Sequence, residues 1–218
     1  AWTLAGQAYC WGANTSGQLG DNTMVGRLWP GFVPGLLDTT SIAAGGGHTC
    51  ALRGAGTASC WGWNIYGQVG DGSTTNRISP MPVSRLSGVR QLTSGRAHTC
   101  ALLTTGAARC WGRNIYGQLG DGTNNNSSTP RPVTGLASAT QLAAGEIHTC
   151  GLAAGQVRCW GDNHGGALGD GTTVSRNTPA AAITGLTSVV GLAVGDRHTC
   201  ARRSNGEVYC WGYNSSGQ

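Results

Sequence analysis

Cysteine and histidine are the residues of this chain whose types and spacing could do chemistry. The tripeptide His-Thr-Cys begins at residues 48, 98, 148 and 198, and a second cysteine always follows it, directly before Trp-Gly. The four pairs are Cys50 with Cys60, Cys100 with Cys110, Cys150 with Cys159, and Cys200 with Cys210. Three kinds of chemistry suit such pairs: disulfide bonds, thiolate–imidazole metal sites, and buried reduced thiols.

The sequence between the paired cysteines favours disulfide bonds. A glycine lies four residues before the second cysteine of each pair, at Gly56, Gly106, Gly155 and Gly206, and glycine readily adopts the positive φ of a tight hairpin turn. A chain that folds back there sets the cysteines opposite each other on antiparallel strands, about 4.5–5.5 Å apart at Cα, which suits a disulfide. The third unit is one residue shorter, and the loss falls in the turn, so the pairing survives.

The other two possibilities stay open at this point. His48 and Cys50 are two residues apart, so on a strand their side chains point the same way and could face Cys60 as metal ligands. Four identical metal sites are less expected than four covalent links, and we predict no metal and no cofactor; a zinc assay and a thiol titration distinguish the three possibilities. Cys10 has no His-Thr-Cys upstream and is predicted to be unpaired or linked to another chain.

These residues recur because the chain repeats itself about every 50 residues, with Cys-Trp-Gly beginning at 10, 60, 110, 159 and 210. Each unit carries about four short apolar runs bounded by Gly, Pro, Asn and Asp, which is typical of strands and turns rather than helices. In one unit the runs are SIAAG (41–45), HTCALR (48–53), TASCWG (57–62) and PMPV (80–83). A period near 50 built of short strands predicts an all-β fold of β-propeller blades.

The repeat resembles that of the regulator of chromosome condensation family across the whole chain. The resemblance lies in CWGRNIYGQLGDG (110–122), AAGEIHT (143–149) and their counterparts in the other units. Members of this family form seven-bladed propellers; some exchange guanine nucleotide on a small nuclear GTPase and sit on chromatin, and some secreted bacterial members inhibit β-lactamases. The paired cysteines depart from the eukaryotic members, so the resemblance implies a cysteine-rich, secreted, bacterial-like version.

The domain organisation follows from the repeat. Residues 1–218 are predicted to form a single propeller region with units at approximately 1–40 (partial), 41–90, 91–140, 141–190 and 191–218 (partial). Since the family implies seven blades, we expect part of a seven-bladed ring or an open, partial propeller. Chains that complete one another's incomplete blades are the alternative.

Comparison of the units with one another separates a shared frame from a variable surface. The frame comprises the Trp-Gly pairs, the asparagine three residues after each of these tryptophans, and the repeated histidines, for which we expect one ring nitrogen to bond to backbone. Four repeated aspartates are predicted to accept hydrogen bonds from their own backbone in Asx-type turns: Asp21, Asp71, Asp121 and Asp170. A calcium site is less expected, because one carboxylate per loop supplies too few of the six or more oxygen ligands that Ca²⁺ takes. No unique acid–base pair breaks the repeat, so we predict that the chain is not an enzyme.

The positions that change between units are the candidate binding residues. They form polar loops (22–29, 72–79, 122–129 and 171–178), the two residues before each repeated histidine, and the residues that flank the repeated asparagine. Loops on a rigid scaffold often carry binding, and aromatic and arginine side chains are enriched at hot spots. The predicted binding residues are Trp63, Tyr66, Arg96, Arg113, Tyr116, Glu146, Arg197 and Tyr213. The alternative is that these are ordinary solvated turns.

The composition argues against two classes of partner. The formal net charge is +5, every basic residue is arginine, and the arginines are scattered apart from Arg202–Arg203, whereas nucleic-acid binders usually carry a basic stripe. No apolar stretch approaches the roughly 20 residues that span a bilayer. We therefore predict no nucleic-acid partner and no membrane insertion.

The function predicted from these patterns is recognition outside the cytosol. Nine cysteines in 218 residues are more typical of an oxidising compartment than of the cytosol, which predicts a secreted or cell-surface protein. We expect a binding scaffold that presents variable loops to a protein or glycan ligand. The alternatives are a structural subunit joined into a fibre or homo-oligomer through half-blades, an enzyme inhibitor, and, least favoured, a guanine-nucleotide exchange factor.

Overall fold

The structure, a computed structural model, describes residues 1–218 and contains strands but no helix. Its antiparallel sheets follow one another along the chain. The first sheet is β1 (Tyr9–Gly12) and β2 (Arg27–Phe32); the second is β3 (Thr39–Ala44), β4 (His48–Arg53), β5 (Ala58–Gly62) and β6 (Arg77–Pro82). The third is β7 (Val89–Ser94), β8 (His98–Leu103), β9 (Ala108–Gly112) and β10 (Ser127–Pro132). The fourth is β11 (Ala139–Ala144), β12 (His148–Ala153) and β13 (Gln156–Gly161), and the fifth is β14 (Val189–Val194), β15 (His198–Arg203) and β16 (Val208–Gly212).

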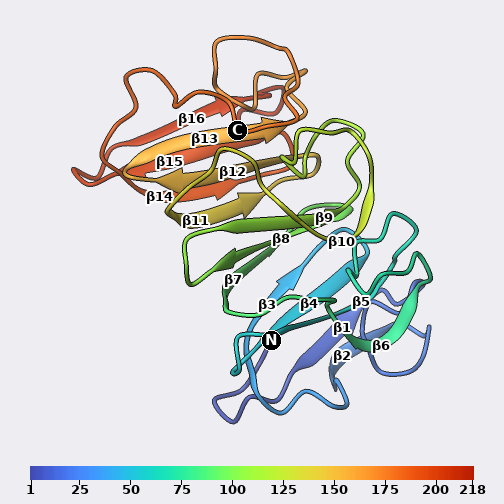
Figure 1. The fold of residues 1–218 in the computed structure, drawn as a ribbon. Coiled ribbons are helices and arrows are strands. Elements are labelled where there is room, and N and C mark those ends of the chain that lie inside the picture. Colours follow the sequence, from blue (N-terminus) through green and yellow to red (C-terminus); the bar gives the residue numbers. More distant parts are fainter.

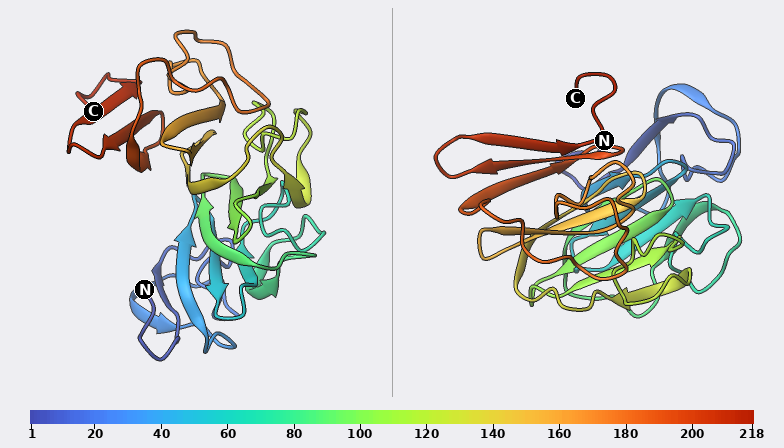
Figure 2. Two further views of the ribbon diagram at one scale, coloured as in Figure 1. Left: turned by 60° about the vertical axis from the view of Figure 1, so that its left-hand side comes forward. Right: turned by 90° about the horizontal axis from the view of Figure 1, so that it is seen from above.

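The sheets stand side by side as the blades of a partial propeller (Figure 1). In the left view of Figure 2 they follow an open arc from the blue N-terminal blade to the red C-terminal blade. The first strands of neighbouring blades, β3, β7, β11 and β14, contact one another in that order. The predicted all-β propeller class is therefore confirmed. None of the chain forms a helix long and apolar enough to cross a membrane.

Each blade has two ends, which we name by their connections. The top end carries the turns between first and second strands (45–47, 95–97, 145–147 and 195–197) and the loops that leave the third strand. The bottom end carries the turns between second and third strands (54–57, 104–107, 154–155 and 204–207) and the connections between blades (83–88, 133–138 and 183–188). The two parts of the top end are hydrogen bonded, because Trp63 N donates to Gly47 O at 2.8 Å and Arg113 N to Ala97 O at 2.9 Å.

A disulfide joins the second and third strands of each of the last four blades. The bonds are Cys50–Cys60, Cys100–Cys110, Cys150–Cys159 and Cys200–Cys210, with Cα atoms 4.0–4.1 Å apart at directly paired positions. In the shortened unit the turn contracts to Ala154 and Gly155, whose φ angles are 50° and 72°, and the register of the cysteines is kept. Cys10 is half-buried and unpaired, and no group of three or more His, Cys, Asp or Glu side chains forms a cluster that could hold a metal ion.

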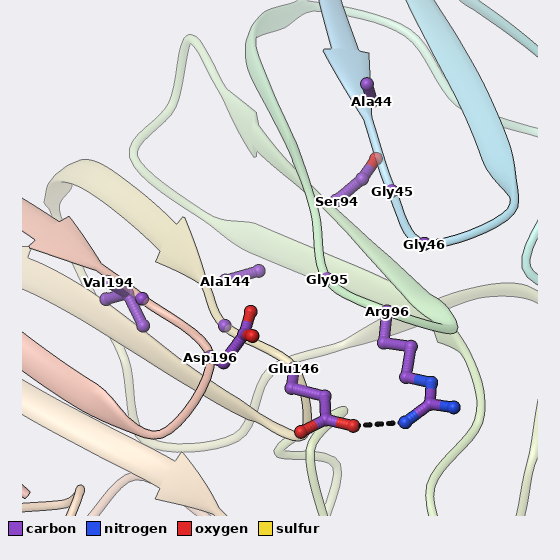
Figure 3. A pocket seen from close by; sticks show the side chains of 12 residues that line it. Ala44, Gly45, Gly46, Ser94, Gly95, Arg96, Ala144, Glu146, Val194 and Asp196 are labelled. Atoms are coloured by element: carbon purple, nitrogen blue, oxygen red, sulfur yellow. Dashed lines mark hydrogen bonds and ion pairs between the residues drawn. The ribbon is translucent and has the colours of Figure 1, made fainter. Parts of the chain in front are cut away.

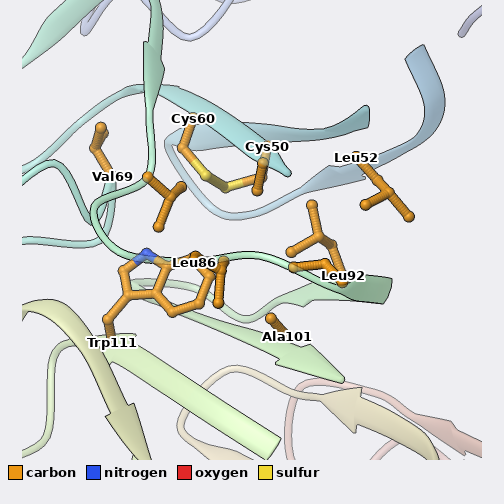
Figure 4. Close-up of a cluster of buried hydrophobic side chains, with 11 residues drawn as sticks. Cys50, Leu52, Cys60, Val69, Leu86, Leu92, Ala101 and Trp111 are labelled. Carbon is orange, nitrogen blue, oxygen red and sulfur yellow. A yellow bond between two sulfur atoms is a disulfide. The ribbon is translucent and has the colours of Figure 1, made fainter. Parts of the chain in front are cut away.

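The hydrophobic core is built between blades rather than within one. In the cluster of Figure 4, the Cys50–Cys60 bridge and Leu92 pack with Trp111. The indole N–H of Trp111 donates to Gln68 O at 2.9 Å, so the buried ring also keeps its polar atom satisfied. The equivalent tryptophans with no exposed surface are Trp61, Trp111 and Trp160. Loss of one such ring costs about 3–5 kcal/mol, and these contacts hold the blades in a fixed arrangement.

The prediction of about four strands per unit holds for two blades and fails for the next. Both β6 and β10 form a fourth strand, and β6 begins at Arg77 because that residue pairs with Gly62. In the blade of β11–β13 the corresponding segment makes only an isolated bridge from Gly161 to Arg176. It stays alongside β13 through single hydrogen bonds, such as Ala180 N to Cys159 O at 2.9 Å.

Candidate functional site

A pocket of about 460 Å³ opens at the top end where the first strands of four blades converge (Figure 3). Each blade contributes the end of its first strand and the start of the following turn, at 44–46, 94–96, 144–146 and 194–196. Backbone hydrogen bonds join these turns in series, from Gly46 N to Arg96 O at 3.2 Å and from Arg96 N to Glu146 O at 3.2 Å. Glu146 N continues the series to Asp196 O at 3.0 Å. We call this the axial pocket.

Glycine is required at the first position of each of these turns. A Cβ on Gly95 would lie 2.3 Å from the carbonyl oxygen of Gly145, and one on Gly145 would lie 2.4 Å from that of Gly195. Gly45 meets Gly95 O in the same way, at 2.6 Å. Since heavy atoms do not approach so closely without strain, the blades come together only where the side chain is absent. In three of the four turns the next residue, Arg96, Glu146 or Asp196, lines the pocket with its side chain, and in the other it is Gly46.

Three charged side chains at the mouth of the axial pocket form one ion-pair group. Arg96 donates from Nη1 to Glu146 Oε1, as Figure 3 shows, and Arg197 Nε donates to Glu146 Oε2 at 3.3 Å. The hydrogen bond from Arg96 is the largest of the causes that lower the pKa of Glu146 below its ordinary value. Asp196 also lines the pocket and forms no ion pair.

Three of the four repeated histidines, His48, His98 and His148, are buried just below the top end and connect one blade to the next. His98 Nε2 lies 2.9 Å from Thr149 Oγ1, and that hydroxyl donates to Gln118 O at 3.0 Å. A hydroxyl has a single proton, so His98 Nε2 is the donor and the neutral ring carries its proton there. The buried Nδ1 of His98 has no partner. Burial lowers the pKa of His98 to about 3, because a charged ring would lose its hydration.

The same arrangement joins His48 to Thr99 at 2.8 Å and His148 to Thr199 at 3.0 Å. Burial lowers the pKa of both histidines to about 4. The prediction that these rings bond to backbone is therefore wrong: the partner is a threonine hydroxyl of the following blade, and that hydroxyl reaches the backbone. The signal was present in the sequence, because threonine follows the histidine in every unit.

A row of side chains from three blades lies beside the axial pocket on the top end. The Trp63 and Tyr66 rings meet edge to face at 5.4 Å, and the guanidinium carbon of Arg113 lies 5.3 Å from the centre of the Tyr66 ring. Further along, Tyr116 and His164 meet edge to face at 5.9 Å. We call these five residues the lateral row. Aromatic–aromatic and arginine–aromatic contacts of this kind hold side chains in defined orientations.

The loops behind the lateral row are held by the repeated asparagine and aspartate. Asn64 accepts a hydrogen bond from Val69 N at 2.8 Å and donates to the backbone carbonyls of Ser73 and Thr75. Asp71 Oδ1 accepts from Ser73 N at 2.9 Å and from its hydroxyl at 2.8 Å, while Oδ2 pairs with Arg77. The predicted Asx-type turn is present, and its carboxylate oxygens already have partners inside the chain.

The structure sorts the predicted binding residues into two groups on one end of the molecule. Arg96, Glu146 and Arg197 belong to the ion-pair group of the axial pocket, and Trp63, Tyr66, Arg113 and Tyr116 belong to the lateral row. Tyr213 occupies the equivalent place in the last blade, where its Cβ lies 3.3 Å from an ideal Cβ on Gly165, and it meets no aromatic ring.

Some contributors to this end could not be singled out from the sequence alone. The hydroxyl of Ser94 lines the axial pocket and is buried without a partner, yet a serine at the end of a strand has nothing unusual in its sequence context. Asp196 is one of several positions that vary between the units. Charged, aromatic and hydroxyl groups that gather at one end of the blades suit binding through hydrogen bonds, ion pairs and stacking.

Sequence profiles of the Regulator of chromosome condensation (RCC1) repeat match most of the chain. One profile matches residues 5–52, 56–102, 106–152 and 154–202, and a second profile of the same repeat matches 40–68, 89–118 and 189–218. No curated protein sequence matched the chain.

Solved structures with the same fold include three from different organisms. Human WBSCR16 is 26% identical with a TM-score of 0.85, and the match covers 97% of this chain and 58% of that one. Prp20p from Saccharomyces cerevisiae is 25% identical with a TM-score of 0.84 and is covered to 55%, with 98% of this chain matched. The ectodomain of the receptor kinase CR4 from Physcomitrella patens is 26% identical with a TM-score of 0.57, over 98% of this chain and 49% of that one.

The chain thus spans between 49% and 58% of the length of these relatives. The repeated His-Thr-Cys and Cys-Trp-Gly segments, the blades that they build and the profile matches over four consecutive units agree with one another. The chain belongs to the Regulator of chromosome condensation (RCC1) repeat family.

Proposed function

We propose that this chain is a binding scaffold that recognises a protein partner through its top end. One observation carries the proposal: the residues that differ between blades gather at this end as the axial pocket and the lateral row, on a frame that recurs from blade to blade. A frame fixed by disulfides and buried tryptophans limits the entropy that binding must overcome, which favours affinity.

Relatives support a protein as the partner. The solved structure of Prp20p is described together with its binding properties to Gsp1p and histones, and another structure shows Kap60 bound to yeast RCC1. Those partners belong to those proteins; what carries over is the use of an RCC1-type propeller as a surface for other proteins. Nucleotide exchange on a GTPase is the less favoured alternative for this chain.

The four disulfides indicate an oxidising compartment, because the cytosol keeps thiols reduced. We propose that this compartment is the cell exterior, either in secreted form or at the cell surface. The match to the CR4 ectodomain supports this setting, since it is a receptor-kinase ectodomain with a related fold.

Paired photo-crosslinking positions test the proposal. The exposed Ile115 lies at the top end and the exposed Ala137 at the bottom end of the connected blades. We expect a photoreactive amino acid at position 115 to give a discrete protein adduct on intact cells, which unlabelled chain competes away. Position 137 should give none. Adducts only from position 137, adducts to carbohydrate, or adducts only to other copies of the chain would contradict a top-end protein-binding role.

A further inference from the structure

Arg113 in the lateral row is an arginine with no partner of opposite charge. It forms no ion pair and no side-chain hydrogen bond within the chain, although its guanidinium lies over the Tyr66 ring. We propose that Arg113 is the receptor for a carboxylate on the partner protein, an aspartate or glutamate side chain. The inference rests on the proposed function and names the chemical group of the partner that the top end recognises.

The edge of the Arg113 guanidinium that carries the two Nη groups is free to bind a carboxylate. Arg113 Nε is buried without a partner. The two Nη groups are not buried and donate no hydrogen bond within the chain, so they are open to solvent. A guanidinium that presents both Nη groups matches a carboxylate in a two-point, charge-assisted hydrogen bond. The contact of Arg113 with the Tyr66 ring, which itself packs against Trp63, restricts the arginine before the partner arrives and so lowers the entropic cost of ordering it on binding.

The charge distribution of the chain supports an external carboxylate. Of nine acidic residues, seven form ion pairs with arginines of the chain: Asp21, Asp38, Asp71, Asp121, Glu146, Asp170 and Glu207. An eighth, Asp162, is hydrogen bonded to His164. Asp196 is the exception, and it lines the axial pocket rather than contacting Arg113. Arg113 therefore has no internal acid left to satisfy it, in a chain whose formal net charge is +5.

The surroundings of Arg113 suit a protein segment. Ile65 and Ile115 lie on the same pair of turns and are 51% and 45% exposed, and the hydroxyls of Tyr66 and Tyr116 have no hydrogen-bond partner in the chain. Exposed aliphatic groups around an arginine and two tyrosines are the composition of a protein–protein hot spot. A sugar would need a free aromatic face to stack on, and one face of Tyr66 is already covered by Arg113.

Selection from a random dodecapeptide phage library on the purified, oxidised chain tests this inference. We expect the selected peptides to contain aspartate or glutamate beside apolar residues. Their affinity should fall roughly 10- to 100-fold in Arg113→Ala, as for loss of a charged hydrogen-bond pair. Arg113→Lys should recover only part of the loss, because a lysine keeps the charge without the planar fork. Arg202→Ala is the matched control: it removes an exposed, ion-pair-free arginine near the bottom end and should bind as the parent does.

An Ile115→Asp variant separates failure of this inference from failure of the proposed function. Peptides that lose binding in Ile115→Asp but keep it in Arg113→Ala would bind the top end without the carboxylate contact, which overturns the inference alone. Peptides unaffected by either substitution would overturn both. Selected peptides without acidic residues, or a library that yields no binder, would also overturn the assignment of Arg113 as a carboxylate receptor.

Discussion

The two ends of the blades obey different constraints. At the bottom end the connections VSRLSG (83–88), VTGLAS (133–138) and ITGLTS (183–188) are nearly the same, and their leucines fill equivalent core positions at 6% exposure each. The residue before each leucine has a positive φ, of 50°, 78° and 78° respectively. In the top-end turns that line the axial pocket, the first residue is always glycine, and the residue after it is Gly, Arg, Glu or Asp. Sequence variation is therefore concentrated at the end where side chains are free of the core.

Acid should destabilise the top end before the bottom end. His48, His98 and His148 have folded-state pKa values of about 4, 3 and 4, below the ordinary value of about 6.5. The unfolded chain therefore takes up protons first, so stability is complete above pH 6.5 and is lost as the pH falls toward 4. We expect a loss of about 3 kcal/mol for each histidine over that range, measured by urea unfolding at a series of pH values.

A His98→Gln variant is the control for the acid effect. Glutamine keeps an N–H that can donate to Thr149, but it does not titrate, so the dependence of the unfolding free energy on pH should become shallower between pH 6.5 and 4. An unchanged slope would show that the buried ring is not responsible. Hydrogen–deuterium exchange, corrected for the pH dependence of the intrinsic exchange rate, should find the first acid-induced opening near residues 95–98 rather than 104–107.

Removal of one disulfide should loosen both ends of a blade equally, because the bond lies midway between them. The pair Cys100–Cys110 closes a ten-residue separation, and the double variant Cys100→Ala/Cys110→Ala should lose about 3 kcal/mol of unfolding free energy. Thermal and urea unfolding measure the loss, and hydrogen exchange gives its distribution. A loss of protection confined to one end would contradict a frame that both ends of the blade share.

Two glycines test the different constraints on the two ends. At Gly95 a methyl group meets backbone at 2.3 Å, so Gly95→Ala should cost about 3 kcal/mol through overpacking between blades. At Gly135 the φ is +78° but nothing lies within 4 Å of an added Cβ, so Gly135→Ala should cost only about 1 kcal/mol through backbone strain. Equal costs in urea unfolding would contradict the assignment of close contact to the top end.

The smallest effect is expected from the exposed ion pairs. The side chain of Arg96 is 61% exposed at the top end, and that of Arg53, paired with Asp38 at the bottom end, is 32% exposed. Each arginine-to-alanine change should cost less than about 1 kcal/mol. By NMR titration, Arg96→Ala should also move the pKa of Glu146 back up toward its ordinary value, since it removes the main hydrogen bond that lowers it. If Arg96→Ala lost more than about 2 kcal/mol of unfolding free energy, Arg96 would stabilise the fold rather than belong to an exposed ion pair.

Much of the frame could be predicted from the sequence because the same motifs recur from unit to unit. Repetition revealed the period of the blades, the paired cysteines and the buried tryptophans. The threonine after each histidine is the one signal for the partner of His98, and the contact itself joins neighbouring blades. The missing fourth strand after β13 could not be predicted, because that unit keeps the polar loop and the proline of its neighbours. The contact of Arg113 with Tyr66 joins residues of neighbouring blades, and no spacing within a single unit indicates it.

The most direct test of the account is hydrogen–deuterium exchange on the chain with and without a protein partner captured through position 115. Slower exchange at residues 95–97 and 113–116, with no change at 104–107 and 133–138, is the result that recognition through the top end predicts. Protection confined to 104–107 and 133–138 would contradict it.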